Sequence, residues 1–211
     1  MAYVSLTFDD GFLYHYAVAK TLHKCGISAS FYVPTGRTPF YPEKWGRLIE
    51  RPDLLGEMVD MGHEIGSHAH THRDLALLSP LDIRLECQES IDELNRVLGS
   101  RSRTYGLAYP YGHFSEAVVR EVSKAFSYAR ATSYYNRWNT IPNLYAIGSV
   151  GPSRHFVKIP FQAASNPSCP IVLLFHRERL PLILSVVQFL RAFNLKIVPL
   201  KTSLTRLGIM T

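Results

Sequence analysis

Thr7-Phe8-Asp9-Asp10-Gly11 closes a short apolar run that begins at Tyr3. The run alternates and is rich in residues that favour β-structure, which predicts a strand over Tyr3–Phe8. Neighbouring side chains on a strand point to opposite faces, but a glycine directly after the pair allows the chain to turn. We therefore expect the carboxylates of Asp9 and Asp10 to converge at the end of this strand. The alternative is an ordinary acidic turn, and the motifs further along decide against it.

Strand and helix patterns alternate along the rest of the chain. Further strands are predicted over Ala29–Val33, Glu64–Ser67, Tyr105–Tyr109, Phe126–Ala131, Tyr145–Val150, Ile171–Phe175 and Lys196–Leu200. Helices are predicted over Tyr14–Cys25, from Leu48 to Met61 with a break at Pro52, from a Ser79 cap to Leu98, from a Ser115 cap to Val122, and over Leu182–Phe193. Repeated βα units indicate a parallel sheet, either open or closed into a barrel. No linker or repeat interrupts the chain, so we expect a single domain over residues 1–211.

The composition is that of an ordinary globular protein. The 211 residues are 46% hydrophobic and 19% charged, which suffices for one sizeable core. No apolar run reaches about 18 residues, so no transmembrane helix is expected. No signal peptide is visible, so we expect a cytoplasmic protein, or a secreted or surface protein if a leader is absent from this sequence. Cys25, Cys87 and Cys169 are widely spaced and are predicted to be free thiols.

The net charge of +6 is unevenly distributed. Residues 1–121 carry 12 Lys and Arg against 16 Asp and Glu, whereas residues 122–211 carry 11 against one, Glu178. A basic half can attract nucleic acid, but these cations are dispersed and form no cluster. A solvated basic face is the favoured interpretation, and no nucleic-acid partner is expected.

Three alternating histidines follow the third predicted strand, in His68-Ala69-His70-Thr71-His72. His68 and His72 are four residues apart, a spacing that lets two imidazoles meet one ion. With Asp10 they would supply three oxygen and nitrogen ligands and leave positions open for water, as in catalytic zinc sites. Exposed histidines in a polar loop are the alternative. His70 is predicted to face away and to serve the structure.

Two further polar motifs follow predicted strands. Tyr109-Pro110-Tyr111-Gly112 is either a simple turn or a rigid loop whose backbone N–H groups face a site. His176 directly ends the apolar strand Ile171–Phe175, a position where a histidine is often structural. Functional sites of parallel α/β folds lie at the carboxyl ends of the strands, so we expect all four polar elements at one edge.

The chain resembles NodB-homology polysaccharide deacetylases, carbohydrate esterase family four, in four ordered motifs. These are Thr7-Phe8-Asp9-Asp10-Gly11, His68-x-x-x-His72, Tyr109-Pro110-Tyr111-Gly112 and Leu173-Leu174-Phe175-His176. The resemblance extends from residue 3 to about residue 200. It implies a deformed (β/α) barrel of about seven parallel strands.

The resemblance also implies a role for each polar residue. Zn²⁺, or another divalent ion such as Co²⁺ or Ni²⁺, would be held by Asp10, His68 and His72. Asp9 would be the general base, the N–H of Tyr111 would help to hold the oxyanion, and His176 would be the general acid. Substrate-binding residues are expected at Tyr109, Pro110, Tyr111 and Trp138. Trp138 would form one side of the acetyl pocket, or alternatively would only pack against the domain.

The sequence departs from the family pattern at three places. Ala69 stands where a hydroxyl residue usually follows the first metal histidine, and Ala108 stands where an arginine often holds the base. The late aspartate that supports the general-acid histidine has no counterpart, since no Asp follows Asp92. Glu178 is a candidate substitute, although an exposed glutamate beside two arginines is the favoured interpretation. Partners of this kind change metal affinity or activity by about 10- to 100-fold.

The predicted function is metal-dependent hydrolysis of N-acetyl, or O-acetyl, groups on a glycan that contains N-acetylglucosamine. An acetylated glycan or oligosaccharide is the expected partner. One alternative is a metal- or glycan-binding protein that keeps the site but has little turnover. Another is a nucleic-acid binder that uses the basic second half, for which the sequence has no recognisable motif.

Overall fold

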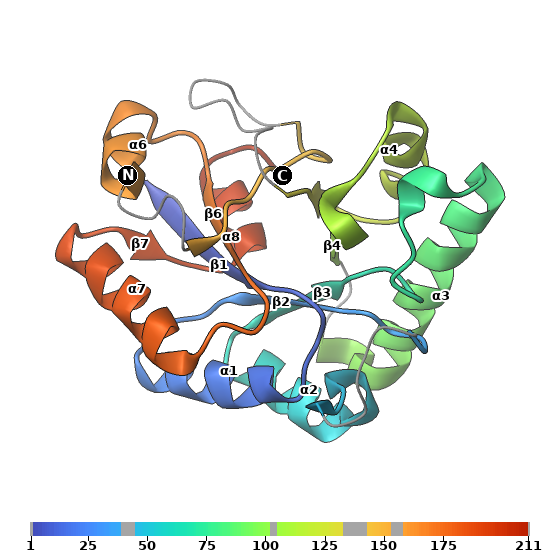
Figure 1. Cartoon of the computed structure of the whole chain (residues 1–211), viewed down its shortest axis with the longest axis horizontal. Coiled ribbons are helices and arrows are strands. Elements are labelled where there is room, and N and C mark those ends of the chain that lie inside the picture. The colour runs from blue at the N-terminus through green and yellow to red at the C-terminus, as the bar shows by residue number, and fades with distance from the viewer. Residues whose placement is uncertain (1, 39–44, 102–104, 133–142, 153–157, 211) are drawn as a thin grey trace.

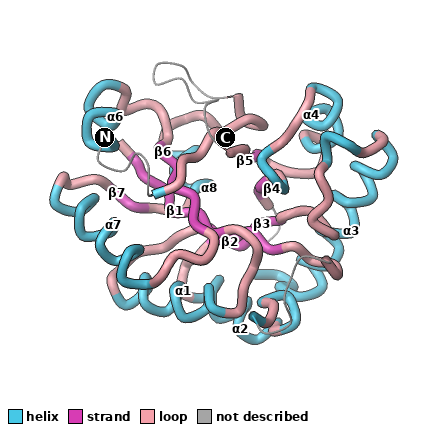
Figure 2. Tube along the Cα trace, in the orientation of Figure 1, coloured by secondary structure: helices cyan, strands magenta, loops and turns pink. Residues whose placement is uncertain are grey.

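The computed structural model describes residues 2–38, 45–101, 105–132, 143–152 and 158–210. Strands gather at the centre of the molecule, and helices form an outer layer around them (Figures 1 and 2). The strands are β1 (Tyr3–Phe8), β2 (Ser30–Val33), β3 (Glu64–Ser67), β4 (Gly106–Ala108), β5 (Tyr128–Arg130), β6 (Ile171–Phe175) and β7 (Lys196–Ile197). The α-helices are α1 (Tyr14–Lys24), α2 (Pro52–Asp60), α3 (Pro80–Leu98), α4 (Glu116–Val122), α6 (Ile159–Ser165), α7 (Leu180–Ala192) and α8 (Leu200–Arg206). Short 3₁₀ helices are η2 (Leu48–Glu50), η3 (Leu75–Leu77), η4 (Gly99–Arg101) and η5 (Pro110–Gly112).

The seven strands form one sheet in which every pair is parallel. Their order is β5-β4-β3-β2-β1-β6, and β7 pairs with the first two residues of β1. β1 has the most neighbours, because it pairs with β6 from Val4 to Phe8 and with β2 at Thr7 and Phe8. This curled sheet with its outer helices is a deformed (β/α) barrel, which confirms the predicted fold class.

The prediction of a strand over Tyr145–Val150 is wrong, because this segment crosses between two edge strands instead of following one. Ile147 makes a single bridge to β5, and Val150 makes a single bridge to β6. The amide of Ile147 donates to the Ala129 carbonyl at 3.1 Å, and that of Val150 donates to the Val172 carbonyl at 3.0 Å. The irregular segment thus joins the two edges of the sheet and completes the barrel wall.

The last predicted strand is shorter than expected. β7 ends at Ile197, and Pro199 then precedes helix α8, which the sequence pattern does not predict. Proline has no N–H for a strand ladder, and the N–H of Leu200 is accepted by the hydroxyl of Ser30 at 2.8 Å. Helix α6, which begins without a side-chain cap, is the other helix that the pattern does not predict.

The other predicted elements agree with the structure to within about two residues at each end. The Ser79 hydroxyl accepts from the Asp82 N–H, and the Ser115 hydroxyl accepts from the Val118 N–H, so both predicted caps are confirmed. The helix predicted from Leu48 splits into η2 and α2. All three cysteines are free thiols, as predicted. None of the helices in the described ranges is both long and apolar enough to cross a membrane.

Alternation along the strands separates the two faces of the barrel wall. Val4, Leu6 and Phe8 of β1 belong to the large core beneath the helices. The residues between them, Ser5 and Thr7, are buried on the opposite face and line the interior of the barrel. Polar side chains in the interior are thus a property of the whole strand, and Asp9 continues their series.

Two tyrosines fill the interior of the barrel. The hydroxyls of Tyr32 and Tyr128 are 2.7 Å apart, and both side chains are fully buried. Gly66 and Gly106 make room for the rings, since a Cβ on Gly66 would lie 2.6 Å from Tyr32 and one on Gly106 would lie 2.1 Å from Tyr128. Glu64 accepts a hydrogen bond from the Tyr128 hydroxyl at 2.6 Å and another from the first turn of α8 at 3.2 Å. The tyrosines and Glu64 therefore tie the barrel wall to the C-terminal helix.

Candidate active site

Five strand ends bring the polar motifs together at one edge of the barrel. They contribute Asp9 and Asp10 after β1, His68 after β3, Tyr109–Gly112 after β4, Arg130 at the end of β5 and His176 after β6. The carboxyl ends of parallel strands meet at one edge, which is where (β/α) barrels hold their functional sites. The four predicted motifs all lie at this edge, and Arg130 joins them unpredicted.

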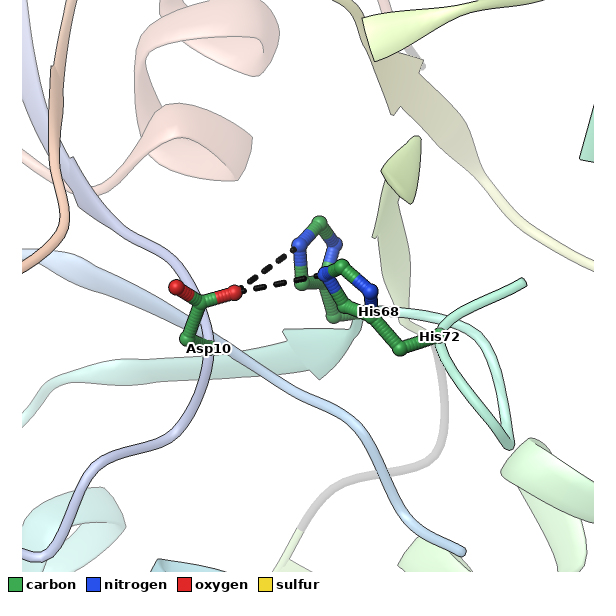
Figure 3. A group of neighbouring side chains, drawn as sticks. All are labelled: Asp10, His68 and His72. Atoms are coloured by element: carbon green, nitrogen blue, oxygen red, sulfur yellow. Dashed lines mark ion pairs between the residues drawn. The ribbon is translucent and has the colours of Figure 1, made fainter. Parts of the chain in front are cut away.

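Asp10, His68 and His72 form a compact group at the centre of this edge (Figure 3). One carboxylate oxygen of Asp10 lies 3.6 Å from Nε2 of His68 and 3.3 Å from Nε2 of His72. The three ligand atoms lie within 4.8 Å of one another. One carboxylate and two imidazoles are a donor set that suits zinc and similar divalent ions, so these residues fit the expected metal.

The orientation of the His68 ring is fixed from behind. Its Nδ1 lies 2.7 Å from the backbone carbonyl of Ala108. A carbonyl only accepts, so Nδ1 carries the proton and the lone pair of Nε2 faces Asp10. Burial lowers the pKa of His68 to about 4, against the opposing field of Asp9. The ring is therefore neutral near pH 7, as a metal ligand must be.

Asp10 is held in its charged form. Burial by itself would raise its pKa, but the hydrogen bond with His72 and the attraction of the nearby His68 and His176 rings in their protonated forms outweigh burial and hold the pKa below its ordinary value. A carboxylate that stays ionised beside two imidazole nitrogens favours a cation between them.

The backbone at this edge is twisted into an uncommon conformation. Asp10, Ala69, His72 and Tyr111 have φ values of +76°, +60°, +61° and +59°. Residues other than glycine adopt this left-handed region at a cost of about 1 kcal/mol or more each, and such residues cluster at functional sites. At Asp10 the turn brings the carboxylate onto the same site as Asp9, although the two residues are neighbours.

Glu86 of helix α3 holds the loop that carries His72. Its buried carboxylate accepts the N–H of His70 at 2.9 Å and that of Thr71 at 2.8 Å, together with the Thr71 hydroxyl. The His70 ring bonds to the Thr35 hydroxyl at 2.9 Å and is not part of the candidate metal-binding group Asp10, His68 and His72. The sequence pattern does not single out Glu86, because its helical position resembles that of any other partly buried glutamate.

Asp9 is held by Arg130 of β5, whereas the family pattern has its arginine at the position of Ala108 in β4. Nη2 of Arg130 donates to both carboxylate oxygens of Asp9, at 2.5 Å for Oδ2, and Nη1 of Arg130 donates to the Ser149 hydroxyl at 3.2 Å. Both charged side chains are buried. Ala108 occupies the position where the family often has an arginine, and here Arg130 of β5 holds the Asp9 carboxylate instead.

His176 lies at the rim, with its Nε2 4.0 Å from Oδ2 of Asp9 and its side chain 46% exposed. Glu178 does not replace the missing aspartate, because its carboxylate accepts the backbone N–H of His176 at 2.6 Å.

The Tyr109–Gly112 loop contributes one side chain to the rim. Tyr111 is 46% exposed, and its ring stands edge-on to that of His72, with the ring centroids 5.1 Å apart. Tyr109 is buried, and its hydroxyl donates to the Tyr145 carbonyl at 3.0 Å. Pro110 is also buried. Both therefore support the loop from beneath. Trp138 lies outside the described residues.

The fold and this edge define a (β/α) barrel with a candidate metal-binding group at the carboxyl ends of its strands, and comparison with known families identifies it. A model of the polysaccharide deacetylase family matches residues 2–129, more than half of the chain. The chain therefore belongs to the polysaccharide deacetylase family, as its four motifs predicted.

Individual relatives agree with this family. The chain is 29% identical over 122 residues to a chitin deacetylase of Arthroderma benhamiae, covering 57% of this chain and 31% of that protein. It is 31% identical over 123 residues to the peptidoglycan-N-acetylmuramic acid deacetylase PdaA of Bacillus subtilis, covering 57% of this chain and 43% of that protein. The chain thus spans less than half the length of either curated relative. A family 4 acetyl xylan esterase from Clostridium thermocellum, solved with a cobalt ion, has the same fold, with a TM-score of 0.66, 20% identity and coverage of 96% of this chain and 90% of that one.

Proposed function

We propose that the protein is a metal-dependent deacetylase that removes N-acetyl groups from a glycan containing N-acetylglucosamine. The observation that carries the proposal is the adjacency of two differently held carboxylates. Asp10 lies against two imidazoles, whereas Asp9 lies against a buried guanidinium. Asp10 is thus available to bind a metal, and Asp9 is available to accept a proton. Amide hydrolysis by an activated water needs both a metal ligand and a general base.

Asp10, His68 and His72 would hold the ion, and zinc is the preferred candidate, with cobalt or nickel as alternatives. When bound there, a divalent ion supplies Lewis-acid chemistry, which favours the deprotonation of water near pH 7 and polarises a carbonyl. The cobalt ion of the esterase with the same fold supports this choice of metal class.

The chain's own residues would move the protons. Asp9 accepts a proton from the attacking water, and the Arg130 guanidinium keeps the carboxylate in place for this step. The water oxygen bonds to the acetyl carbon, and the N–H of Tyr111 stabilises the oxygen that becomes negative. His176 then donates a proton to the amine nitrogen as the carbon–nitrogen bond breaks. The products are acetate and a free amino sugar, and O-acetyl esters are a second substrate class for the same chemistry.

Acetate release tests this function. The protein is loaded with zinc, cobalt or nickel and incubated with N-acetylglucosamine oligomers, and acetate and bound metal are measured together. We expect acetate from the wild type, and an Asp9→Asn variant that keeps its metal but loses most turnover, because an amide does not accept the proton. Binding of metal and oligomer without acetate release would establish the binding-protein alternative instead.

A further inference from the structure

His15 lies beneath His176 and is fully buried. Its Nε2 is 2.6 Å from the backbone carbonyl of His176. The rings of Phe8 and Phe12 surround it at centroid distances of 5.6 and 5.5 Å, both edge-on. A polar ring in this aromatic environment needs an explanation, because burying polar nitrogens is costly unless they are hydrogen-bonded.

Only one of the two ring nitrogens of His15, Nε2, makes a hydrogen bond within the described part of the chain. Its Nδ1 is buried and has no hydrogen-bond partner among the residues that the structure describes. A phenylalanine would pack among the same rings without that penalty, so what the imidazole adds is the donor at Nε2. Since a carbonyl only accepts, Nε2 carries the proton. Burial lowers the pKa of His15 to about 4, so near pH 7 the ring is a neutral donor with a fixed tautomer.

The bond from His15 is one half of a clamp on the backbone of His176. The N–H of His176 donates to the Glu178 carboxylate at 2.6 Å, and the Tyr14 hydroxyl donates to the Glu178 carbonyl at 3.3 Å. The first two residues of α1 thus hold the turn that follows β6. These hydrogen bonds fix the backbone of His176. They are the support for His176 in a chain that has no counterpart of the family's late aspartate.

We propose that His15 is a positioning residue that fixes His176 for proton delivery to the leaving amine. The inference rests on the proposed function. A shift of the reacting groups by about 1 Å costs on the order of 100-fold in rate, so loss of this single bond is measurable without unfolding the protein.

The test compares His15→Phe, which keeps the packing, with His15→Gln, whose amide can donate to the same carbonyl. Each zinc-loaded variant is assayed on an N-acetylglucosamine oligomer and on 4-nitrophenyl acetate, whose phenolate leaves without a proton. On the oligomer we expect kcat of His15→Phe to fall by about 10- to 100-fold with KM and metal content unchanged, and His15→Gln to recover most of it. On the aryl ester all three proteins should react at similar rates. His15→Met replaces His15→Phe if the latter does not fold.

A purely structural His15 predicts another pattern. His15→Phe would then match the wild type, or both substrates would slow together, and either result overturns the proposal. Nitrogen-15 NMR of the imidazoles gives a readout independent of turnover, with His15 expected as the neutral Nε2–H tautomer and the His176 ring signals expected to broaden in His15→Phe but not in His15→Gln. Identical His176 signals in all three proteins would also refute it. Failure of the proposed function appears in the wild type as absent acetate, whereas failure of the positioning role appears in the variants.

Discussion

Nη2 of Arg130 donates to both carboxylate oxygens of Asp9, although the two residues are 121 positions apart in the chain. Arg130 ends β5 and Asp9 follows β1, so the pair spans the interior of the barrel. Both side chains are buried, and removing one partner of a buried pair leaves an uncompensated charge. The ion pair therefore links the stability of the barrel to the state of the proposed base.

Arg130→Gln should damage both stability and turnover. We expect a loss of about 3 kcal/mol in the free energy of unfolding, because the Asp9 carboxylate stays buried without its partner. We also expect kcat to fall by roughly 100-fold with bound metal retained, because the base is no longer held. Urea unfolding, metal analysis and acetate release measure the three quantities. Arg120→Gln, at an exposed arginine of α4, is the matched control and should leave all three unchanged.

Substitutions should distinguish the candidate metal ligands Asp10, His68 and His72 from His70, which lies between the two histidines in the sequence. Asp10→Ala, His68→Ala and His72→Ala each remove one of the three converging ligands and should lower bound zinc from one per chain to near none. His70→Ala is the control, because its ring bonds to Thr35, and it should keep the metal. Elemental analysis after gel filtration measures the content. Normal zinc in the His68 and His72 variants would rule out this ligand set.

Glu86 should matter to the metal without touching it. Glu86→Ala removes the acceptor of two backbone N–H groups in the loop that carries His72. We expect zinc affinity to fall by about 10- to 100-fold, the range found when groups that orient metal ligands are lost. Competition with a chromophoric chelator measures it. Asp92→Ala, at an exposed acidic residue of the same helix whose carboxylate accepts from the Gln88 side chain, is the control and should retain wild-type affinity.

The interior of the barrel should not tolerate one added methyl group. Gly66→Ala would bring a Cβ to 2.6 Å from the Tyr32 ring and 2.8 Å from the Gly106 carbonyl. Overpacking of this kind costs about 1 to 3 kcal/mol, and we expect thermal melting to show the loss. Gly151→Ala is the control, since its Cβ would meet nothing within 4 Å. Equal melting temperatures for the two variants would contradict the packing described for the tyrosines.

Acid should weaken the fold through buried neutral histidines. Burial lowers the pKa of His15 and of His63 to about 4, below the value of about 6.5 for an unfolded chain. Between these values the unfolded chain binds more protons than the folded one, so stability is complete above about pH 6.5 and falls as the pH decreases toward 4. We expect a loss on the order of 2 kcal/mol per histidine, measured by urea unfolding with a chelator present. His15→Gln has no such proton and should show a flatter pH dependence, and an equal slope in both proteins would contradict the prediction.

The sequence is most informative where a local pattern is sufficient. β1, β3 and β6 have the predicted bounds because their apolar runs are clear and end in polar motifs. The group Asp10, His68 and His72 comes together because parallel strands end at one edge.

The features that the sequence does not predict depend on contacts between residues that are far apart in the chain. Segment 145–150 has the composition of a strand, but its bridges go to two different neighbours. Arg130 ends a three-residue strand whose sequence has no distinctive motif. Only the folded barrel shows that its side chain faces Asp9. His15 likewise occupies what a helical pattern treats as an ordinary buried position, and its role depends on the carbonyl of His176.

The left-handed residues at the polar edge have an evolutionary consequence. At Asp10, His72 and Tyr111 a substitution by glycine would relieve backbone strain, because glycine adopts positive φ freely. Glycine at these three positions would therefore erase the proposed site while relieving the backbone. A lineage released from selection for catalysis would lose these side chains first while its barrel persisted. The side chains at these positions are therefore kept at a cost to the backbone, as the proposed site would require.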